Sequence, residues 1–302
     1  MEGVEPSYKG YECLDTFYLY DEFGFQYFGD VRPGNTYTAT GGNLAIQSVV
    51  RGIKSHRNHT DSRIWIRADN GYYGTNIMNA CLDAGADFVI KAKQTKDFDR
   101  ICKQVLDWKL EDESDPNRIR FYDGRECEIS VTHYKPKKSS RRLRYVVMRA
   151  EKPQPKESLF EDHIEYDYLV FCTSLDEVRV PRREVIFYYR KRGQAENHIK
   201  EAKYGDDLKH YPCQSLLANK AYGLIAAFSY NIMRYIALCE APKTGTKTIK
   251  TLRNKLIFIP CMVAQTCREK ITRMNRFHME VLTKWLEIIK IPKLVCIPSN
   301  SG

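Results

Sequence analysis

The chain has 302 residues, which is enough for one large domain or two small ones with a substantial core. Its ten cysteines form no CxxC pair, which argues against a structural zinc site and for free thiols in a reducing compartment. No signal peptide is visible at the amino end, so we expect a cytoplasmic protein. The net charge of +10 favours a polyanionic partner.

The amino-terminal part of the sequence predicts a β-hairpin followed by a helix. The runs TFYLY and FQYFGDV are rich in aromatic residues and flank a turn at residues 21–24. The pattern of residues 40–54 then predicts a helix.

Residues 63–92 predict a strand, a helix and a second strand. Residues 64–66 are apolar and indicate a buried strand, a helix covers about 75–84, and residues 88–90 begin the next strand. Asp69 follows the first of these strands at its carboxyl end, where functional groups gather in open α/β sheets. We therefore expect a metal ligand at Asp69, and the alternative is a turn residue.

Residues 95–178 predict a helix and then a β-rich segment. Apolar spacing indicates a helix over residues 98–110. Strand-like runs follow at 119–132, 143–149 and 166–173. The polar segments HYKPKKSSRR and EKPQPKESL separate these runs and predict flexible loops.

The charged segment YYRKRGQAENHIKEAK covers residues 188–203. It holds four polar residues at helical spacing: Tyr189, Arg192, Glu196 and Lys203. One continuous helix, opened by Pro181, would place all four within an arc of about 60°. Such a carboxylate can bind a metal while the neighbouring cations hold phosphate. The alternative is a solvated helix with ion pairs at i,i+4 spacing.

The carboxyl-terminal part combines an apolar helix with a basic end. Residues 221–239 are the most apolar stretch, but polar residues interrupt it, so we expect a buried helix and no membrane span. Residues 241–302 hold twelve Lys and Arg against three Glu, whereas the rest of the chain is nearly neutral. This distribution favours DNA as the partner, and ordinary solvation of a charged surface is the alternative.

Two of these segments together resemble a known family. RADNGYYG contains Asp69 and is followed about 120 residues later by Y-x2-R-x3-E-x6-K. In this order they resemble the DDE transposases of bacterial insertion sequences, and among them the cut-and-paste group with the YREK signature. YECLDTF, DVRPGNTYTA and LLANKAYGLIAAFSYNIMRYI resemble other segments of that group. The resemblance covers about residues 2–285.

The resemblance implies an RNase H-like core in which three carboxylates hold two divalent ions, usually Mg²⁺. Such ions activate a water and then a DNA 3′-hydroxyl for attack on phosphodiesters. Asp69 matches the second carboxylate and Glu196 the third, so both are expected to be catalytic metal ligands. Tyr189, Arg192 and Lys203 are expected to bind phosphates at the transposon end.

The expected partner is double-stranded DNA, both the terminal inverted repeats of the element and the target. The resemblance implies a homodimer acting on paired ends in the cytoplasm, associated with the nucleoid. The polar loops HYKPKKSSRR and EKPQPKESL are candidates for contacts with this DNA.

The first aspartate of the family has no clear counterpart. It lies upstream of the segment matched by YECLDTF, where only MEGVEPSYKG is found. Asp15 is the alternative, although it aligns inside the later segment, and Asp21 and Asp30 match less well. We therefore expect a chain shortened at its amino end, without the central first strand and inactive in transposition.

The predicted fold class is α/β, with an RNase H-like core and a β-rich insertion between Asp69 and the glutamate helix. The predicted regions are a first part of the core (1–94), a helix with the insertion (95–178), helices that carry Glu196 (179–240) and a basic end (241–302). Two alternatives have other functions: a non-catalytic DNA-binding remnant that interferes with the full-length enzyme, and an RNase H-like nuclease.

Overall fold

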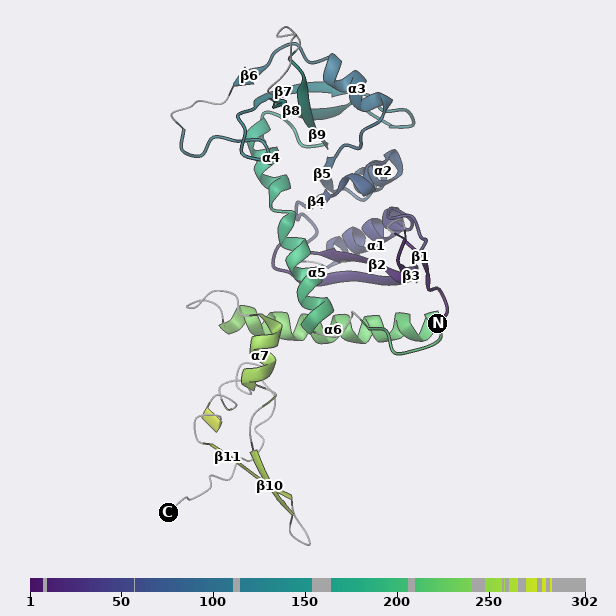
Figure 1. Ribbon diagram of the computed structural model, residues 1–302, viewed down its shortest axis with the longest axis vertical. Helices are drawn as coiled ribbons and strands as arrows, with labels where there is room; N and C mark the ends of the chain where they lie inside the picture. Colours follow the sequence, from purple (N-terminus) through teal and green to yellow (C-terminus); the bar gives the residue numbers. More distant parts are fainter. Residues whose placement is uncertain are drawn as a thin grey trace. The chain divides into compact units, whose positions relative to one another are not determined.

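The protein is described by a computed structural model and divides into two compact units (Figure 1). Unit 1 comprises Met1–Gly34 and Ala195–Gly302, and unit 2 comprises Asn35–Gln194. The four predicted regions of the sequence stay a prediction. The structure describes residues 1–7, 10–56, 58–110, 115–153, 164–205, 210–240, 248–256, 258, 261–265, 270–275, 279–280 and 283.

Unit 1 begins with a small antiparallel sheet in the order β1-β2-β3. Its strands are β1 (Glu5–Pro6), β2 (Glu12–Tyr20) and β3 (Gln26–Pro33). The turn between β2 and β3 is stabilised by Asp21, whose Oδ1 accepts hydrogen bonds from the N–H groups of Phe23 (2.9 Å) and Phe25 (2.8 Å). The predicted hairpin is therefore confirmed.

The long helix α6 (Leu216–Glu240) packs against β3. Asn231 holds the two elements together, because its amide accepts from Gln26 N–H at 2.8 Å and donates to Gln26 O at 2.9 Å. Tyr230 is fully buried in the core of this unit and packs edge-on against Tyr20. The other elements of unit 1 are α5 (Gly193–Gly205), which belongs to it from Ala195 onward, α7 (Ile249–Leu256), β10 (Cys261–Gln265) and β11 (Lys270–Met274).

One side of α6 departs from the predicted buried helix. Leu224, Ile225 and Phe228 are exposed, whereas Met233 and Ala237 are buried. Apolar residues occur all round this helix, but only part of its circumference meets the core of unit 1. Within the described residues, no helix is long and apolar enough to cross a membrane.

Unit 2 is a mixed sheet with helices, in the strand order β4-β5-β9-β8-β7-β6. β4 and β5 are parallel, as in a β-α-β unit, and the other neighbours are antiparallel. The strands are β4 (Trp65–Ala68), β5 (Asp87–Lys91), β6 (Lys109–Leu110), β7 (Glu128–Tyr134), β8 (Leu143–Glu151) and β9 (Tyr166–Thr173). The helices are α1 (Gly42–Ser55), η1 (Asn70–Tyr72), α2 (Thr75–Asp83), α3 (Lys96–Lys103) and α4 (Arg182–Arg190).

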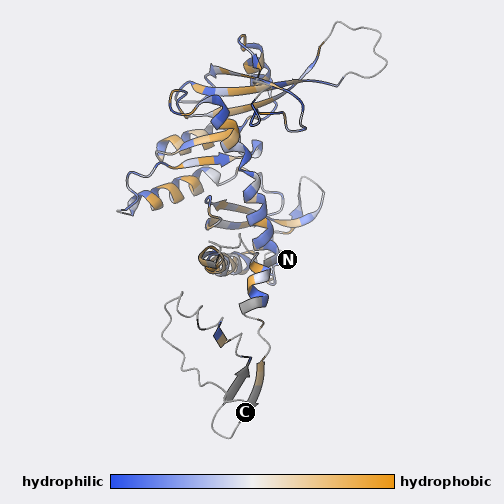
Figure 2. Ribbon diagram, turned by 90° about the vertical axis from the view of Figure 1, so that its left-hand side faces the viewer, coloured by the Kyte–Doolittle hydropathy of each residue, from blue (hydrophilic) through white to orange (hydrophobic). Residues whose placement is uncertain are grey.

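Both faces of this sheet are covered, so its strands carry long apolar runs (Figure 2). On one face Val185 and Ile186 of α4 pack with Val146 and Met148 of β8. On the other face Tyr145 is buried beside Tyr73, with their hydroxyl oxygens 3.2 Å apart. Strand alternation thus separates one cluster under α4 from a second one on the opposite face.

Two predictions for the insertion are wrong in part. The helix predicted over 98–110 ends at Lys103, because Lys109 and Leu110 instead pair with β7 as the short strand β6. The strand predicted over 119–132 begins only at Glu128. The residues before it form a tight turn, in which Gly124 N–H donates to Phe121 O. Local apolar spacing could not reveal the first change, since it depends on the pairing of Lys109 and Leu110 with β7.

Candidate active site

Asp69 lies directly after β4, at the carboxyl end of the strand, as the sequence predicts. It is the N-cap of η1, and its Oδ1 accepts a hydrogen bond from Asn70 N–H at 2.6 Å. Its side chain is 48% exposed. The carboxylate is therefore oriented by the backbone at one oxygen while remaining accessible to solvent.

Arg192 and Tyr189 lie in the same unit as Asp69. The Arg192 guanidinium is 3.9 Å from Asp69 Oδ2 and 6.0 Å from the centre of the Tyr189 ring. Tyr189 packs in turn against Phe171 of β9, with ring centres 4.7 Å apart. Unit 2 thus brings together three of the five residues that the sequence predicts for the site. The separation of Arg192 from Asp69 lies at the outer limit of an ion pair.

Two residues that the sequence analysis did not identify hold this cluster in place. Tyr188 donates its hydroxyl hydrogen to Trp65 O at 2.7 Å, and Arg67 donates to Tyr188 O at 3.0 Å. The Arg67 guanidinium also lies 4.7 Å from the centre of the Tyr188 ring. The end of α4 is therefore fastened to β4, the strand that leads to Asp69. An arginine inside the apolar run RIWIRA was the signal that could have identified Arg67.

Glu196 and Lys203 belong to unit 1, in the first and last turns of α5. Their seven-residue separation places them on one side of that helix. Glu196 is exposed and Lys203 is half-buried. The carboxylates of Asp69 and Glu196 thus belong to different units, and their approach to a common metal stays a prediction.

The single helix predicted for all four YREK residues is wrong. Helix α4 ends at Arg190, and α5 begins at Gly193. The connecting turn is tightened by an i→i−3 hydrogen bond from Arg192 N–H to Tyr189 O at 2.8 Å. Gly193 favours such an interruption, because a glycine inside a helix lowers helix stability by about 1 kcal/mol relative to alanine. Pro181 is accordingly the N-cap of α4 and not of the helix that carries Glu196.

The environment of α5 shifts the pKa of two further groups. Burial raises the pKa of the Glu201 carboxyl, and the nearby Arg234 opposes this effect. Burial also lowers the pKa of His198, and Arg234 lowers it further. Both groups are therefore biased toward their neutral forms. Glu196 is not among the causes of either shift. Both shifts come from burial and from Arg234, within unit 1.

The aspartates considered for the missing first carboxylate each have a partner within unit 1. Asp15 receives hydrogen bonds from two nitrogens of Arg32, including Nε at 2.9 Å, and Arg32 is buried. Asp21 accepts backbone bonds in the β2–β3 turn. Asp30 pairs with Lys220 of α6 at 2.8 Å. These contacts favour structural roles for all three side chains.

The donor chemistry at Asp69 suits a hard divalent cation, because carboxylate oxygens are the ligands that Mg²⁺ prefers. Asp69 has a solvent-accessible carboxylate, with one oxygen oriented by Asn70. Among the described residues no group of three His, Cys, Asp or Glu side chains is close enough to hold a metal. One carboxylate alone does not form such a site, so joint ligation of a metal by Asp69 and Glu196 stays a prediction.

Comparison with known proteins identifies the family. A search of curated proteins found no match. The model of the family described as transposase DDE domain group 1 matches residues 5–290, which include Asp69 and the whole YREK segment. The predicted relationship to DDE transposases is thereby confirmed at the level of the family. The chain belongs to the transposase DDE domain group 1 family.

Proposed function

We propose that the chain is the catalytic domain of an insertion-sequence transposase, an enzyme that cleaves and joins phosphodiesters at the ends of its element. That this particular chain is inactive in transposition stays a prediction, because no first carboxylate is assigned in it. The observation that supports this most directly is the cluster of Asp69, Arg192 and Tyr189 at the carboxyl end of β4. A carboxylate beside an arginine suits a reaction in which a metal ligand and a phosphate-binding group act on one DNA strand.

The residues have separate roles in this proposal. Asp69 and Glu196 are the catalytic metal ligands of an RNase H-like core. Arg192 binds the phosphate of the cleaved end through its planar guanidinium, whose geometry matches phosphate oxygens. Tyr189 supports Arg192 through its ring, and Lys203 adds a second cation on the same side of α5 as Glu196.

Two divalent ions such as Mg²⁺, held in part by Asp69 and Glu196, would supply activation of the attacking oxygen and stabilisation of the leaving one. The protein's own contribution is to orient the ligands. Asn70 N–H holds one oxygen of Asp69, and the second oxygen lies at the edge of ion-pairing distance from Arg192. Arg192 is therefore positioned to contact DNA phosphate without filling the carboxylate's coordination positions.

The test compares Asp69→Asn, Glu196→Gln and Arg192→Ala in the full chain. Metal binding is measured as the rise in melting temperature with Mg²⁺ or Mn²⁺, and end binding with a duplex that carries the element's terminal repeat. We expect the first two variants to lose the metal-induced stabilisation and any strand cleavage, while they retain end binding. Arg192→Ala should keep the metal response but bind the end about tenfold more weakly or worse, since a charge-assisted hydrogen bond contributes about 1.5–3 kcal/mol.

Asp83→Asn is the matched control, because Asp83 is an exposed carboxylate on α2 of the same unit. It should leave both measurements unchanged. An unaltered metal response in Asp69→Asn and Glu196→Gln would contradict the assignment of ligands. DNA that is cut but never joined would favour an RNase H-like nuclease, and binding without cleavage would favour a non-catalytic DNA-binding protein.

A further inference from the structure

The turn between β7 and β8 concentrates positive charge. Residues 133–142, HYKPKKSSRR, contain five Lys or Arg and no acidic residue. All five are exposed, and within the described part of the chain none of them forms an ion pair: Lys135, Lys137, Lys138, Arg141 and Arg142. We call this segment the basic turn. Unpaired cations on one turn attract polyanions more strongly than the interspersed charges of an ordinary surface.

Several contacts fix the backbone of the basic turn in the structure. Lys138 has a φ of 65°, which is unusual for a residue with a side chain. Ser139 is buried, and its hydroxyl donates to Arg141 O at 2.8 Å. The Asn79 amide of α2 donates to Lys138 O at 3.2 Å. The cations are therefore carried by a turn that is hydrogen-bonded to α2 of unit 2.

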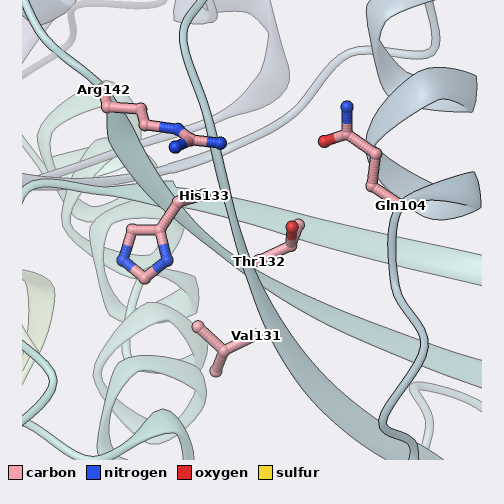
Figure 3. Close-up of a pocket in the computed structure, with 5 residues that line it drawn as sticks. All are labelled: Gln104, Val131, Thr132, His133 and Arg142. Atoms are coloured by element: carbon pink, nitrogen blue, oxygen red, sulfur yellow. The ribbon is translucent and has the colours of Figure 1, made fainter.

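An open pocket of about 610 Å³ lies beside the basic turn (Figure 3). It is lined by Gln104, Val131, Thr132, His133 and Arg142. Figure 3 shows the side chains of Arg142 and Gln104 on either side of Thr132. β6 pairs only with Glu128 and Ile129 of β7, so the pocket residues Val131, Thr132 and His133 of the same strand lie beyond that pairing.

The lining of this pocket suits an anion. Arg142 supplies a charged fork, and Thr132, Gln104 and His133 supply polar groups that can donate hydrogen bonds. Among the described residues, no carboxylate lines the pocket. Asp97 of the neighbouring helix α3 is engaged by the Tyr134 hydroxyl at 2.9 Å and by Arg100 at 3.1 Å.

We propose that the basic turn and this pocket form a second DNA-binding site, in which Arg142, His133, Thr132 and Gln104 bind a phosphodiester of the DNA backbone. The inference rests on the proposed function, since it places the same DNA substrate on a second surface of unit 2. The exposed cations of the turn contact the neighbouring phosphates. Because backbone phosphates carry no base identity, this site contributes affinity and register but little sequence selectivity.

The test measures binding of the full chain to a fluorescently labelled duplex by anisotropy over a series of salt concentrations. The variant Arg141→Gln with Arg142→Gln removes two charges from the site. The matched control, Arg51→Gln with Arg63→Gln, removes two exposed arginines elsewhere in unit 2. We expect the first pair to weaken binding about tenfold and to reduce the slope of log affinity against log salt by about 1–2, since each phosphate contact contributes about one. The control pair should change affinity less than twofold.

A third variant, Thr132→Val, tests the pocket without any change of charge. It should weaken binding about two- to fivefold with an unchanged salt slope, because one hydroxyl donor is lost. Hydrogen exchange should also show protection of residues 131–142 on addition of DNA. Equal losses in the two arginine pairs, with no protection of this segment, would overturn the second site and leave only bulk charge.

Failure of this inference can be separated from failure of the proposed function. If only the second site is wrong, Arg192→Ala still weakens binding and the variants of the basic turn behave like the control pair. If the proposed function is wrong, Asp69→Asn keeps its metal response, whatever the basic turn does. Arg141→Gln with Arg142→Gln should leave the metal-induced stabilisation unchanged in either case.

Discussion

Tyr188 connects the end of α4 to β4 through both its side chain and its backbone. Its hydroxyl donates to Trp65 O, and its own carbonyl accepts from Arg67. Its ring packs edge-on against Trp65, with centres 5.2 Å apart. These contacts determine where Tyr189 and Arg192 lie relative to Asp69, although none of the three residues Tyr188, Trp65 and Arg67 has a direct role in the proposed chemistry.

We predict that Tyr188→Phe lowers the free energy of unfolding by about 1 kcal/mol, the usual contribution of one internal hydrogen bond. The ring and its packing remain, so the change isolates the hydroxyl. Urea denaturation of the full chain provides the measurement. Tyr122→Phe is the control, because Tyr122 is 74% exposed, and it should change stability by less than about 0.5 kcal/mol. Equal effects of both substitutions would contradict the role of the Tyr188–Trp65 bond.

Glu201 carries a pKa that makes the stability of unit 1 depend on pH. Burial raises the pKa of its carboxyl above the ordinary 4.5, and its Oε2 is buried without a hydrogen-bond partner within the described residues. A carboxyl whose pKa is raised in the folded state favours folding below its ordinary pKa. That contribution is lost as the pH rises through the raised pKa.

Glu201→Gln should therefore stabilise the protein at neutral pH, and the difference from the wild type should disappear below about pH 4.5. Urea denaturation at a series of pH values checks this. Glu184→Gln, a change at an exposed carboxylate of α4, should give a curve parallel to that of the wild type. A stability difference for Glu201→Gln that is independent of pH would show that burial of the charge is not its cause.

At the scale of elements, two helices differ from the ranges that local patterns predict. Helix α3 is shorter than its apolar spacing predicts, since Lys109 and Leu110 are taken into the sheet by β7. The YREK segment is divided between α4 and α5 at Gly193. In contrast, α1, α2, β4 and β5 lie close to their predicted ranges, because each combines clear periodicity with a clear terminating signal such as Gly85.

The junction of the small sheet depends on Gly34. A Cβ atom at this position would collide with the backbone carbonyl oxygens of Cys13 and Glu5. Its N–H also donates to Gly3 O at 3.0 Å. The chain thus passes so close to β1 and β2 that a side chain has no space, whatever its rotamer.

We predict that Gly34→Ala lowers the free energy of unfolding by about 1–3 kcal/mol, since overpacking here meets backbone and not a movable side chain. Gly52→Ala in α1 is the matched control, because nothing lies within 4 Å of the added Cβ. That change should stabilise the protein by about 0.5–1 kcal/mol through helix propensity. Thermal and urea denaturation of both variants checks the opposite signs. A neutral Gly34→Ala would show that β1 moves away without loss.

At the scale of the whole molecule, the catalytic residues expected from the family are divided between two compact units. Asp69, Tyr189 and Arg192 belong to unit 2, and Glu196 and Lys203 to unit 1. The strongly basic end at residues 241–302 lies largely outside the described residues, so its role as a DNA-binding region stays a prediction. The basic turn of unit 2, which the sequence offered as a candidate for DNA contacts, adds exposed positive charge to that unit.

Residue patterns along the chain were enough to predict the family, the order of the main elements and the position of Asp69 at the end of its strand. Those features depend on local periodicity, turn residues and short motifs, all of which can be recognised along the chain. Only the tertiary structure revealed the bonds from Tyr188 and Arg67 to β4, the pairing of Asp15 with Arg32, and the pocket beside the basic turn. These contacts join residues far apart in sequence, and local patterns carry no information about which distant partner a polar side chain will meet.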